Sequence, residues 1–145
     1  MAAITRILVP VDLGESTERT LDYARMLARP FRASLLLMHV VPNPYAKMTS
    51  EAYMPPPQDF LDELESEARN RLKALLADGD RSEFNAETLV EVGDPLCAIV
   101  EHATVRNVDL IVMGTHGRTG VAHLLLGSVA ERVVRTAPCP VLTIR

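Results

Sequence analysis

The chain has 145 residues, of which 48% are hydrophobic and 23% charged, and its net charge is −4. This length fits a single domain over residues 1–145, and the composition is typical of a soluble globular protein. The negative charge and the lack of a basic stretch argue against nucleic acid as the main partner. We find no signal-peptide pattern and no apolar run long enough to span a bilayer, so we expect a cytoplasmic protein without a membrane partner.

Five short apolar segments predict five β-strands. They are Ile4–Val11, Ser34–Val41, Phe84–Val92, Asp109–Met113 and Val141–Ile144. The first, second and fourth are apolar at nearly every position, as in parallel strands that are covered on both faces. The third differs, because Glu87 and Glu91 alternate with apolar residues, so we place it at an edge of the sheet.

Four helical patterns separate these strands. The first starts near Ser16, and the second spans about Gln58–Ala77 with leucines at spacings of three and four. The third opens with Asp94 as N-cap and a proline at the first helical position. The fourth opens at Ser128, where a glutamate three residues later predicts a capping box.

The alternation of strands and helices predicts an α/β fold. We expect three layers: an open, parallel, five-stranded sheet with four helices divided between its two faces. A strand order of 3-2-1-4-5 would place the ligand crevice at the carboxyl ends of strands one and four, where the order reverses. The connection Pro42–Pro57 holds five of the ten prolines, and it is either a functional lid or a tolerated surface insertion.

Two distant segments should meet at this crevice. Strand one ends in Pro10-Val11-Asp12 and offers a carboxylate, whereas strand four leads into the glycine-rich segment Met113–Gly120. Each feature alone is ordinary for a turn. Because both fall at the point where the strand order reverses, together they predict a ligand site.

The glycine-rich segment has the composition of a phosphate-binding loop. Gly114 and Gly117 allow the backbone to approach a ligand closely. Gly127 directly precedes Ser128 at a helix start, where free amides and the helix dipole suit a phosphate. No Gly-Lys-Ser/Thr follows, so the segment is not a Walker A loop.

The spacing Gly114-x2-Gly117-x9-Gly127-Ser128 resembles the ATP-binding signature of the universal stress protein family. The opening Ile7-Leu8-Val9-Pro10-Val11-Asp12, the segment Val92-Gly93-Asp94-Pro95 and the closing Ala137-Pro138-Cys139-Pro140-Val141-Leu142 agree with it, so the resemblance covers the whole chain. It implies a Rossmann-like fold of the adenine nucleotide alpha hydrolase type, and it implies binding of ATP.

By position, the resemblance also implies which residues bind the nucleotide. The nucleoside would be lined by Pro10, Val11 and Asp12, with Val40 or Val41 against the adenine. The ribose and phosphates would be held by Met113, Gly114, Gly117, Arg118, Gly127, Ser128 and Val129, and His116 could touch a phosphate. Mg²⁺ would sit on the phosphates, with a water-mediated contact to Asp12.

Family members usually form homodimers, and the last strand supports this independently. Val141–Ile144 carries no charge, and an uncharged sheet edge invites a second strand. We therefore expect a regulatory, stress-response protein that binds an adenine nucleotide. A slow ATPase, a nucleotide-dependent transferase and a ligand-free dimerisation module remain open, although the sequence offers no clear general base and no arginine finger.

Overall fold

The computed structural model describes residues 3–43, 55, 57–115 and 126–145. Five strands and five helices occupy these residues: β1 (Arg6–Pro10), α1 (Thr17–Phe31), β2 (Ser34–Val41), α2 (Gln58–Ala74), α3 (Asp80–Phe84), β3 (Glu87–Val92), α4 (Pro95–Val105), β4 (Leu110–Gly114), α5 (Ser128–Thr136) and β5 (Val141–Ile144). None of the helices in these ranges has both the length and the apolar character that crossing a membrane requires.

The strands form one parallel sheet in the order β3-β2-β1-β4-β5, which confirms the predicted order. β1 lies at the centre, with Ile7 opposite Leu35 on β2 and Leu110 on β4. β3 and β5 are the two edges. The strand order reverses between β1 and β4, so the crevice that such sheets use for ligands lies beyond the ends of these two strands.

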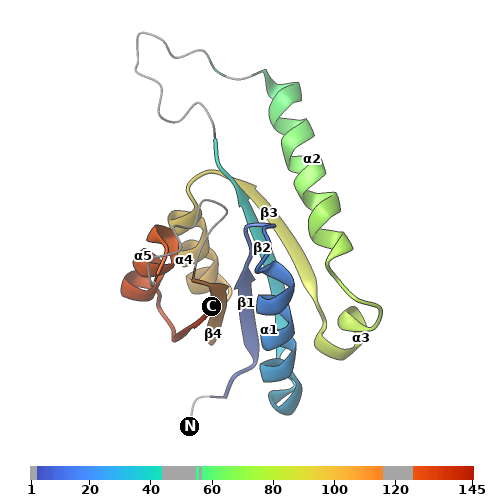
Figure 1. Cartoon of the computed structure of the whole chain (residues 1–145), viewed down its shortest axis with the longest axis vertical. Coiled ribbons are helices and arrows are strands. Elements are labelled where there is room, and N and C mark those ends of the chain that lie inside the picture. Colours follow the sequence, from blue (N-terminus) through green and yellow to red (C-terminus); the bar gives the residue numbers. More distant parts are fainter. Residues whose placement is uncertain (1–2, 44–54, 56, 116–125) are drawn as a thin grey trace.

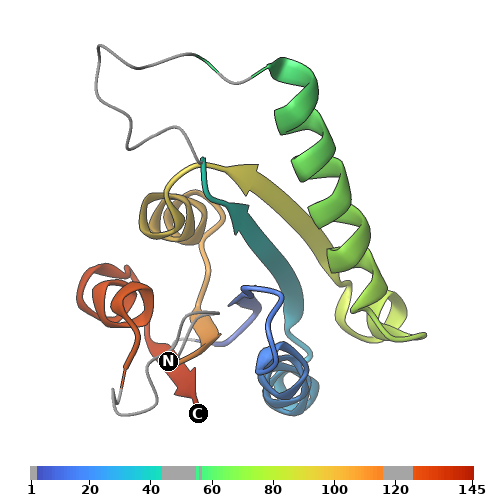
Figure 2. The same cartoon turned by 45° about the horizontal axis from the view of Figure 1, so that its top comes forward.

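Helices cover both faces of the sheet, which confirms the three predicted layers. Successive side chains of a strand point to opposite faces. Accordingly, Ile7 and Val9 pack in the core shared with α1, whereas Leu8 packs in the core shared with α4 and α5. Figures 1 and 2 show α1, α2 and α3 on one side of the sheet and α4 and α5 on the other.

The largest differences from the prediction are an additional helix and a later start of the third strand. The sequence analysis expected four helices and a strand that begins at Phe84, but residues Asp80–Phe84 form the additional helix α3 and β3 begins at Glu87. Phe84 is buried in the core on the side of α1. Its apolar character therefore reflects packing beneath a helix and not membership of the strand.

A buried ion pair holds α3 against α1. The Asp80 carboxylate accepts hydrogen bonds from Arg25 Nε at 3.0 Å, from Arg25 Nη2 at 2.7 Å and from the backbone amide of Ala77 at 2.7 Å. Burial alone would raise the pKa of Asp80, but the bonds from Arg25 and Ala77 outweigh it and lower the pKa. The bond to Ala77 closes the turn after α2, which ends at Ala74 and not at Ala77 as predicted.

A second carboxylate fastens β4 to β1 at the amino ends of the strands. Asp109 Oδ2 accepts hydrogen bonds from the Thr5 amide at 2.8 Å, the Thr5 hydroxyl at 2.8 Å and the Arg6 amide at 3.0 Å. These bonds, led by that from the Thr5 amide, lower the pKa of Asp109. This end of the sheet is therefore cross-linked by charge-assisted hydrogen bonds.

Candidate functional site

A cavity of about 670 Å³ lies at the carboxyl ends of the strands, between α2, α4 and α5. This volume is within the usual range for small-molecule sites. Ten of the predicted site residues line it: Pro10, Val11, Asp12, Val40, Val41, Met113, Gly114, Gly127, Ser128 and Val129. His116, Gly117 and Arg118 lie outside the described residues. The fold thus brings together the ends of β1 and β4, which are far apart in the sequence.

The connection from β1 to α1 forms one wall and presents a carboxylate. Asp12 Oδ1 accepts hydrogen bonds from the Gly14 amide at 2.8 Å and from the Thr17 hydroxyl at 3.4 Å. The turn is tight, because a Cβ on Gly14 would lie 3.1 Å from Asp12 Oδ1. Leu13, between them, has a φ of +64°, a left-handed conformation that leucine rarely adopts. The turn holds Asp12 at the cavity.

The floor of the cavity consists of neighbouring strand ends joined by hydrogen bonds. The Val11 amide donates to the Met38 carbonyl at 2.8 Å, and His39 Nδ1 lies 2.8 Å from the Val11 carbonyl. Val40 and Val41 are buried beside them, and Ile99 of α4 lines the same space. This side therefore offers an apolar surface against which a flat ring can pack.

The start of α5 forms the opposite wall. The Gly127 amide donates to the Thr115 carbonyl, so the end of β4 and the start of α5 lie side by side at the cavity. The first helical bond runs from the Glu131 amide to the Gly127 carbonyl at 2.9 Å. The amides of Ser128, Val129 and Ala130 precede that bond, and such amides have no partner within a helix.

The predicted capping box is not formed. Gly127, and not Ser128, occupies the N-cap position, and glycine has no side chain with which to cap the helix. Ser128 is instead the first residue of the helix, and it is exposed and lines the cavity. The wall therefore offers both backbone amides and a hydroxyl to an anion.

Among the described residues, no group of three or more His, Cys, Asp or Glu side chains is arranged to hold a metal ion. Mg²⁺ nevertheless needs no such group when phosphates supply most of its ligands, since one or two carboxylates and several waters complete its shell. Asp12 and Glu67 are the carboxylates that line the described part of the cavity. The residues present thus fit Mg²⁺ that is carried by a phosphate ligand.

Comparisons with known proteins identify the family. Residues 3–145 match the model of the universal stress protein family. The chain belongs to the universal stress protein family. A universal stress protein of Methanocaldococcus jannaschii is 35% identical over 143 residues, which cover 97% of this chain and 81% of the relative.

Solved structures agree with this assignment. The universal stress protein UspA from Lactobacillus plantarum superposes with a TM-score of 0.85 at 28% identity and covers the whole of both chains. A universal stress protein solved in complex with cAMP has a TM-score of 0.63 at 28% identity, with 99% of this chain and 98% of that chain covered. This universal stress protein therefore shares its fold over its full described length with relatives of which one binds an adenine nucleotide.

One wall of the cavity was missed by sequence reasoning. It comes from α2, whose residues Leu64, Glu67, Ala68 and Arg71 line the cavity. The apolar spacing of α2 predicts Leu64 and Ala68 only as core residues. The signal that could have revealed the wall is the pair of charged residues on that same helical face.

Proposed function

We propose that this universal stress protein binds ATP, or a related adenine nucleotide, together with Mg²⁺, and that nucleotide occupancy regulates it. The observation that carries the proposal is the shared cavity: the described part of the glycine signature, the Asp12 turn and the ends of β2 all line it. The relative in complex with cAMP supports the same class of ligand.

The chemistry of the walls suggests how the nucleotide lies. Val40 and Val41 would pack against the adenine, and Asp12 would face the nucleoside and contact Mg²⁺ through water. The amides of Ser128 and Val129 would donate to the phosphates, aided by the helix dipole of α5. Mg²⁺, when bound, neutralises phosphate charge in this slightly acidic protein. The segment with His116, Gly117 and Arg118 would complete the phosphate side.

Isothermal titration with ATP, ADP and AMP, with and without Mg²⁺, tests the proposal. We expect saturable binding of ATP that is stronger with Mg²⁺. Gly114→Val should abolish binding, because a branched side chain would enter the cavity beside β4. Circular dichroism and the unfolding midpoint verify that this variant folds. Absence of binding at millimolar ATP would instead favour a ligand-free dimerisation module.

A hydrolysis assay separates regulation from enzymatic turnover. We expect phosphate release well below about one turnover per second, the low end of typical enzyme rates. Faster release that Asp12→Asn abolishes would identify the protein as an ATPase or a nucleotide-dependent transferase. The control is Asp78→Asn, because Asp78 is exposed and does not line the cavity.

A second proposal concerns assembly: two copies pair along β5 as a homodimer in the cytoplasm. β5 is an edge of the sheet, its residues are uncharged, and Leu142 is 37% exposed. Edge strands of this kind pair readily with another copy. Leu142→Lys should shift sedimentation from dimer to monomer, whereas Val134→Lys on the exposed surface of α5 should not. A wild-type monomer at all concentrations would contradict the proposal.

A further inference from the structure

One face of α2 looks onto the cavity. Leu64, Glu67, Ala68 and Arg71 all line it, and their spacings of three and four place them on one side of the helix. Ala68 is buried, whereas Glu67 and Arg71 are exposed. The first turns of α2 stand above the carboxyl ends of the strands in Figure 1. The helix therefore brings two charged side chains to the rim of the cavity.

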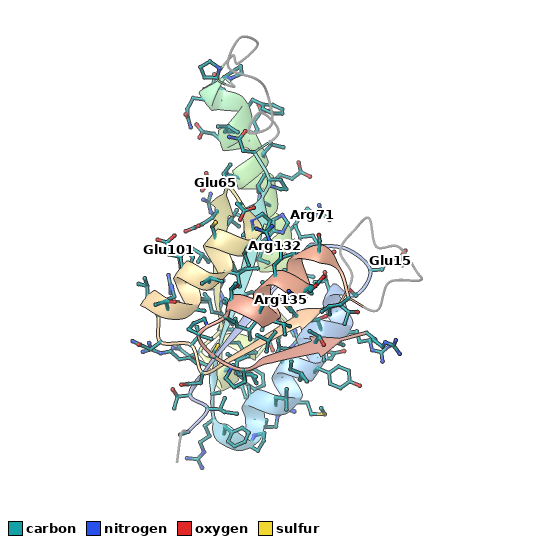
Figure 3. The ribbon with its side chains drawn as sticks, turned by 90° about the vertical axis from the view of Figure 1, so that its left-hand side faces the viewer. Glu15, Glu65, Arg71, Glu101, Arg132 and Arg135 are labelled. Carbon is teal, nitrogen blue, oxygen red and sulfur yellow. The ribbon has the colours of Figure 1, made fainter. Side chains whose placement is uncertain are left out.

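Arg71 binds a distant backbone carbonyl and not a neighbouring acidic side chain. Glu67 precedes it by four residues, which is the spacing of a local ion pair. Arg69 pairs with Glu65 in that way at 2.9 Å on the same helix. Arg71 instead donates from Nη2 to the Leu13 carbonyl at 3.2 Å, 58 residues away. Figure 3 labels Arg71 between α2 and the connection that carries Glu15. The guanidinium thus links α2 to the turn after β1.

This contact fixes a peptide group that also holds Asp12. The carbonyl of Leu13 and the amide of Gly14 belong to one planar peptide unit. Arg71 binds the carbonyl, and Asp12 Oδ1 accepts from the amide at 2.8 Å. The left-handed φ of Leu13 is unfavourable for leucine, so this orientation needs support from outside the turn. Arg71 supplies that support.

We propose that Arg71 is a positioning residue, which acts through the Leu13–Gly14 peptide to fix the Asp12 carboxylate for nucleotide binding. This inference rests on the proposed function and deepens it, because it assigns a role to α2 at the nucleoside end of the site. Arg71 need not touch the ligand. In the absence of Mg²⁺, its effect should therefore be the same for nucleotides that differ only in their number of phosphates.

Titration of Arg71→Gln with ATP and with AMP, both without Mg²⁺, tests the inference. We expect the Kd to rise about fivefold for both ligands, as for the loss of one typical hydrogen bond, because Arg71 is exposed and acts on the ligand only through the turn. Arg71→Lys keeps a charged donor on a long side chain and should restore most of the affinity. Arg69→Gln is the matched control on the same helix, because its ion pair with Glu65 lies away from the cavity, and it should bind as the wild type does.

Amide exchange in the ligand-free protein gives an independent readout. The Gly14 amide should exchange faster in Arg71→Gln than in the wild type or in Arg69→Gln, because the peptide loses one of its two anchors. An unchanged exchange rate at Gly14 overturns the inference.

The binding outcomes separate the inference from the proposed function. Wild-type binding with an unchanged Kd in Arg71→Gln overturns the inference alone. A larger loss for ATP than for AMP in the absence of Mg²⁺ also overturns it, because the guanidinium would then contact phosphate directly. If the wild type binds neither ligand, the proposed function fails and this inference falls with it.

Discussion

The two ends of the sheet use their carboxylates differently. At the amino ends, Asp109 and Asp80 accept hydrogen bonds from donors such as Thr5 and Arg25, which are 104 and 55 residues away in the sequence. At the carboxyl ends, Asp12 accepts bonds from Gly14 and Thr17, within its own turn. The carboxylates at the amino ends join different helices and strands, whereas Asp12 is held in place at the cavity by its own turn.

This contrast predicts that the carboxylates at the amino ends contribute to stability, whereas Asp12 contributes to ligand binding. In the described residues, no donor reaches Asp12 Oδ2, so that oxygen remains available to a ligand. By contrast, three donors converge on Asp109 Oδ2. Substitutions at the amino end should therefore change the free energy of unfolding, and substitutions at the carboxyl end should change affinity.

The largest effect is expected for Asp80→Ala. The variant removes the buried partner of Arg25 and the acceptor of the Ala77 amide, and it leaves Arg25 with only the exposed Asp22 as an ion-pair partner in the part of the chain that the structure describes, so we expect a cost of about 3 kcal/mol. Urea unfolding should show this loss in the free energy of unfolding, while ATP affinity of the folded variant stays unchanged. Asp78→Ala, two residues earlier and exposed, should cost less than about 0.5 kcal/mol. A similar loss in both variants would show that the ion pair is not the cause.

Asp109→Asn should lower the free energy of unfolding by about 2 kcal/mol at pH 7, because three bonds to a charged acceptor are weakened. The pKa of Asp109 is lower in the folded protein than in the unfolded chain. Its contribution is therefore complete above the unfolded pKa of about 4 and is lost as the pH falls further. Unfolding measured from pH 7 to pH 2 should show a smaller acid loss in the variant than in the wild type. Parallel pH profiles would contradict the assignment.

Asp12→Asn should weaken ATP binding about tenfold in the presence of Mg²⁺ and less in its absence, since the amide cannot support a hydrated cation as a carboxylate does. The free energy of unfolding should change by less than about 1 kcal/mol, because the amide oxygen can still accept from Gly14. Titration and urea unfolding of the same preparation check both statements. If Asp12→Asn strongly destabilised the fold but left the Kd for ATP unchanged, Asp12 would act in stability as the carboxylates at the amino ends do.

Gly14→Ala should have the smallest effect. The added Cβ would lie 3.1 Å from Asp12 Oδ1, closer than ordinary contacts, and would push the carboxylate aside. We expect about a threefold rise in the Kd for ATP, equivalent to about 0.6 kcal/mol. Titration measures this change, and Ala77→Gly on the exposed side of the α2–α3 turn provides a control outside the cavity. An unaltered Kd would show that the turn adapts without moving Asp12.

The sheet could be predicted because its signal is local. Ser34–Val41 is apolar at most positions, and the structure gives β2 the same bounds. The alternation of strands and helices and the handedness of their connections indicated a parallel sheet, and the order 3-2-1-4-5 was adopted as a common one for five strands. α3 could not be predicted, because Arg25, from a different part of the chain, stabilises it. The start of α5 at Ser128 was predicted correctly, but its N-cap was misplaced by one residue, because Gly127 occupies the N-cap position.

The site was predictable to the extent that its residues follow strand ends. Asp12 and Gly114 lie directly beyond or at the ends of β1 and β4, so the fold class alone places them at the crevice. The wall from α2 leaves only a weak trace in the sequence, its pair of charged residues, since which helical face meets the cavity depends on how α2 packs across β2 and β3. Arg71 illustrates this: its contact with Leu13 joins residues that no sequence spacing relates.

The central position of β1 has a mechanical consequence. Its side chains alternate between two hydrophobic cores, so neither core can loosen without disturbing the other. Backbone amides of this strand should therefore open only when the whole molecule unfolds, whereas the turn from Asp12 to Thr17 can fluctuate by itself. A bound molecule would rest on a rigid base while the surrounding rims adjust to its shape.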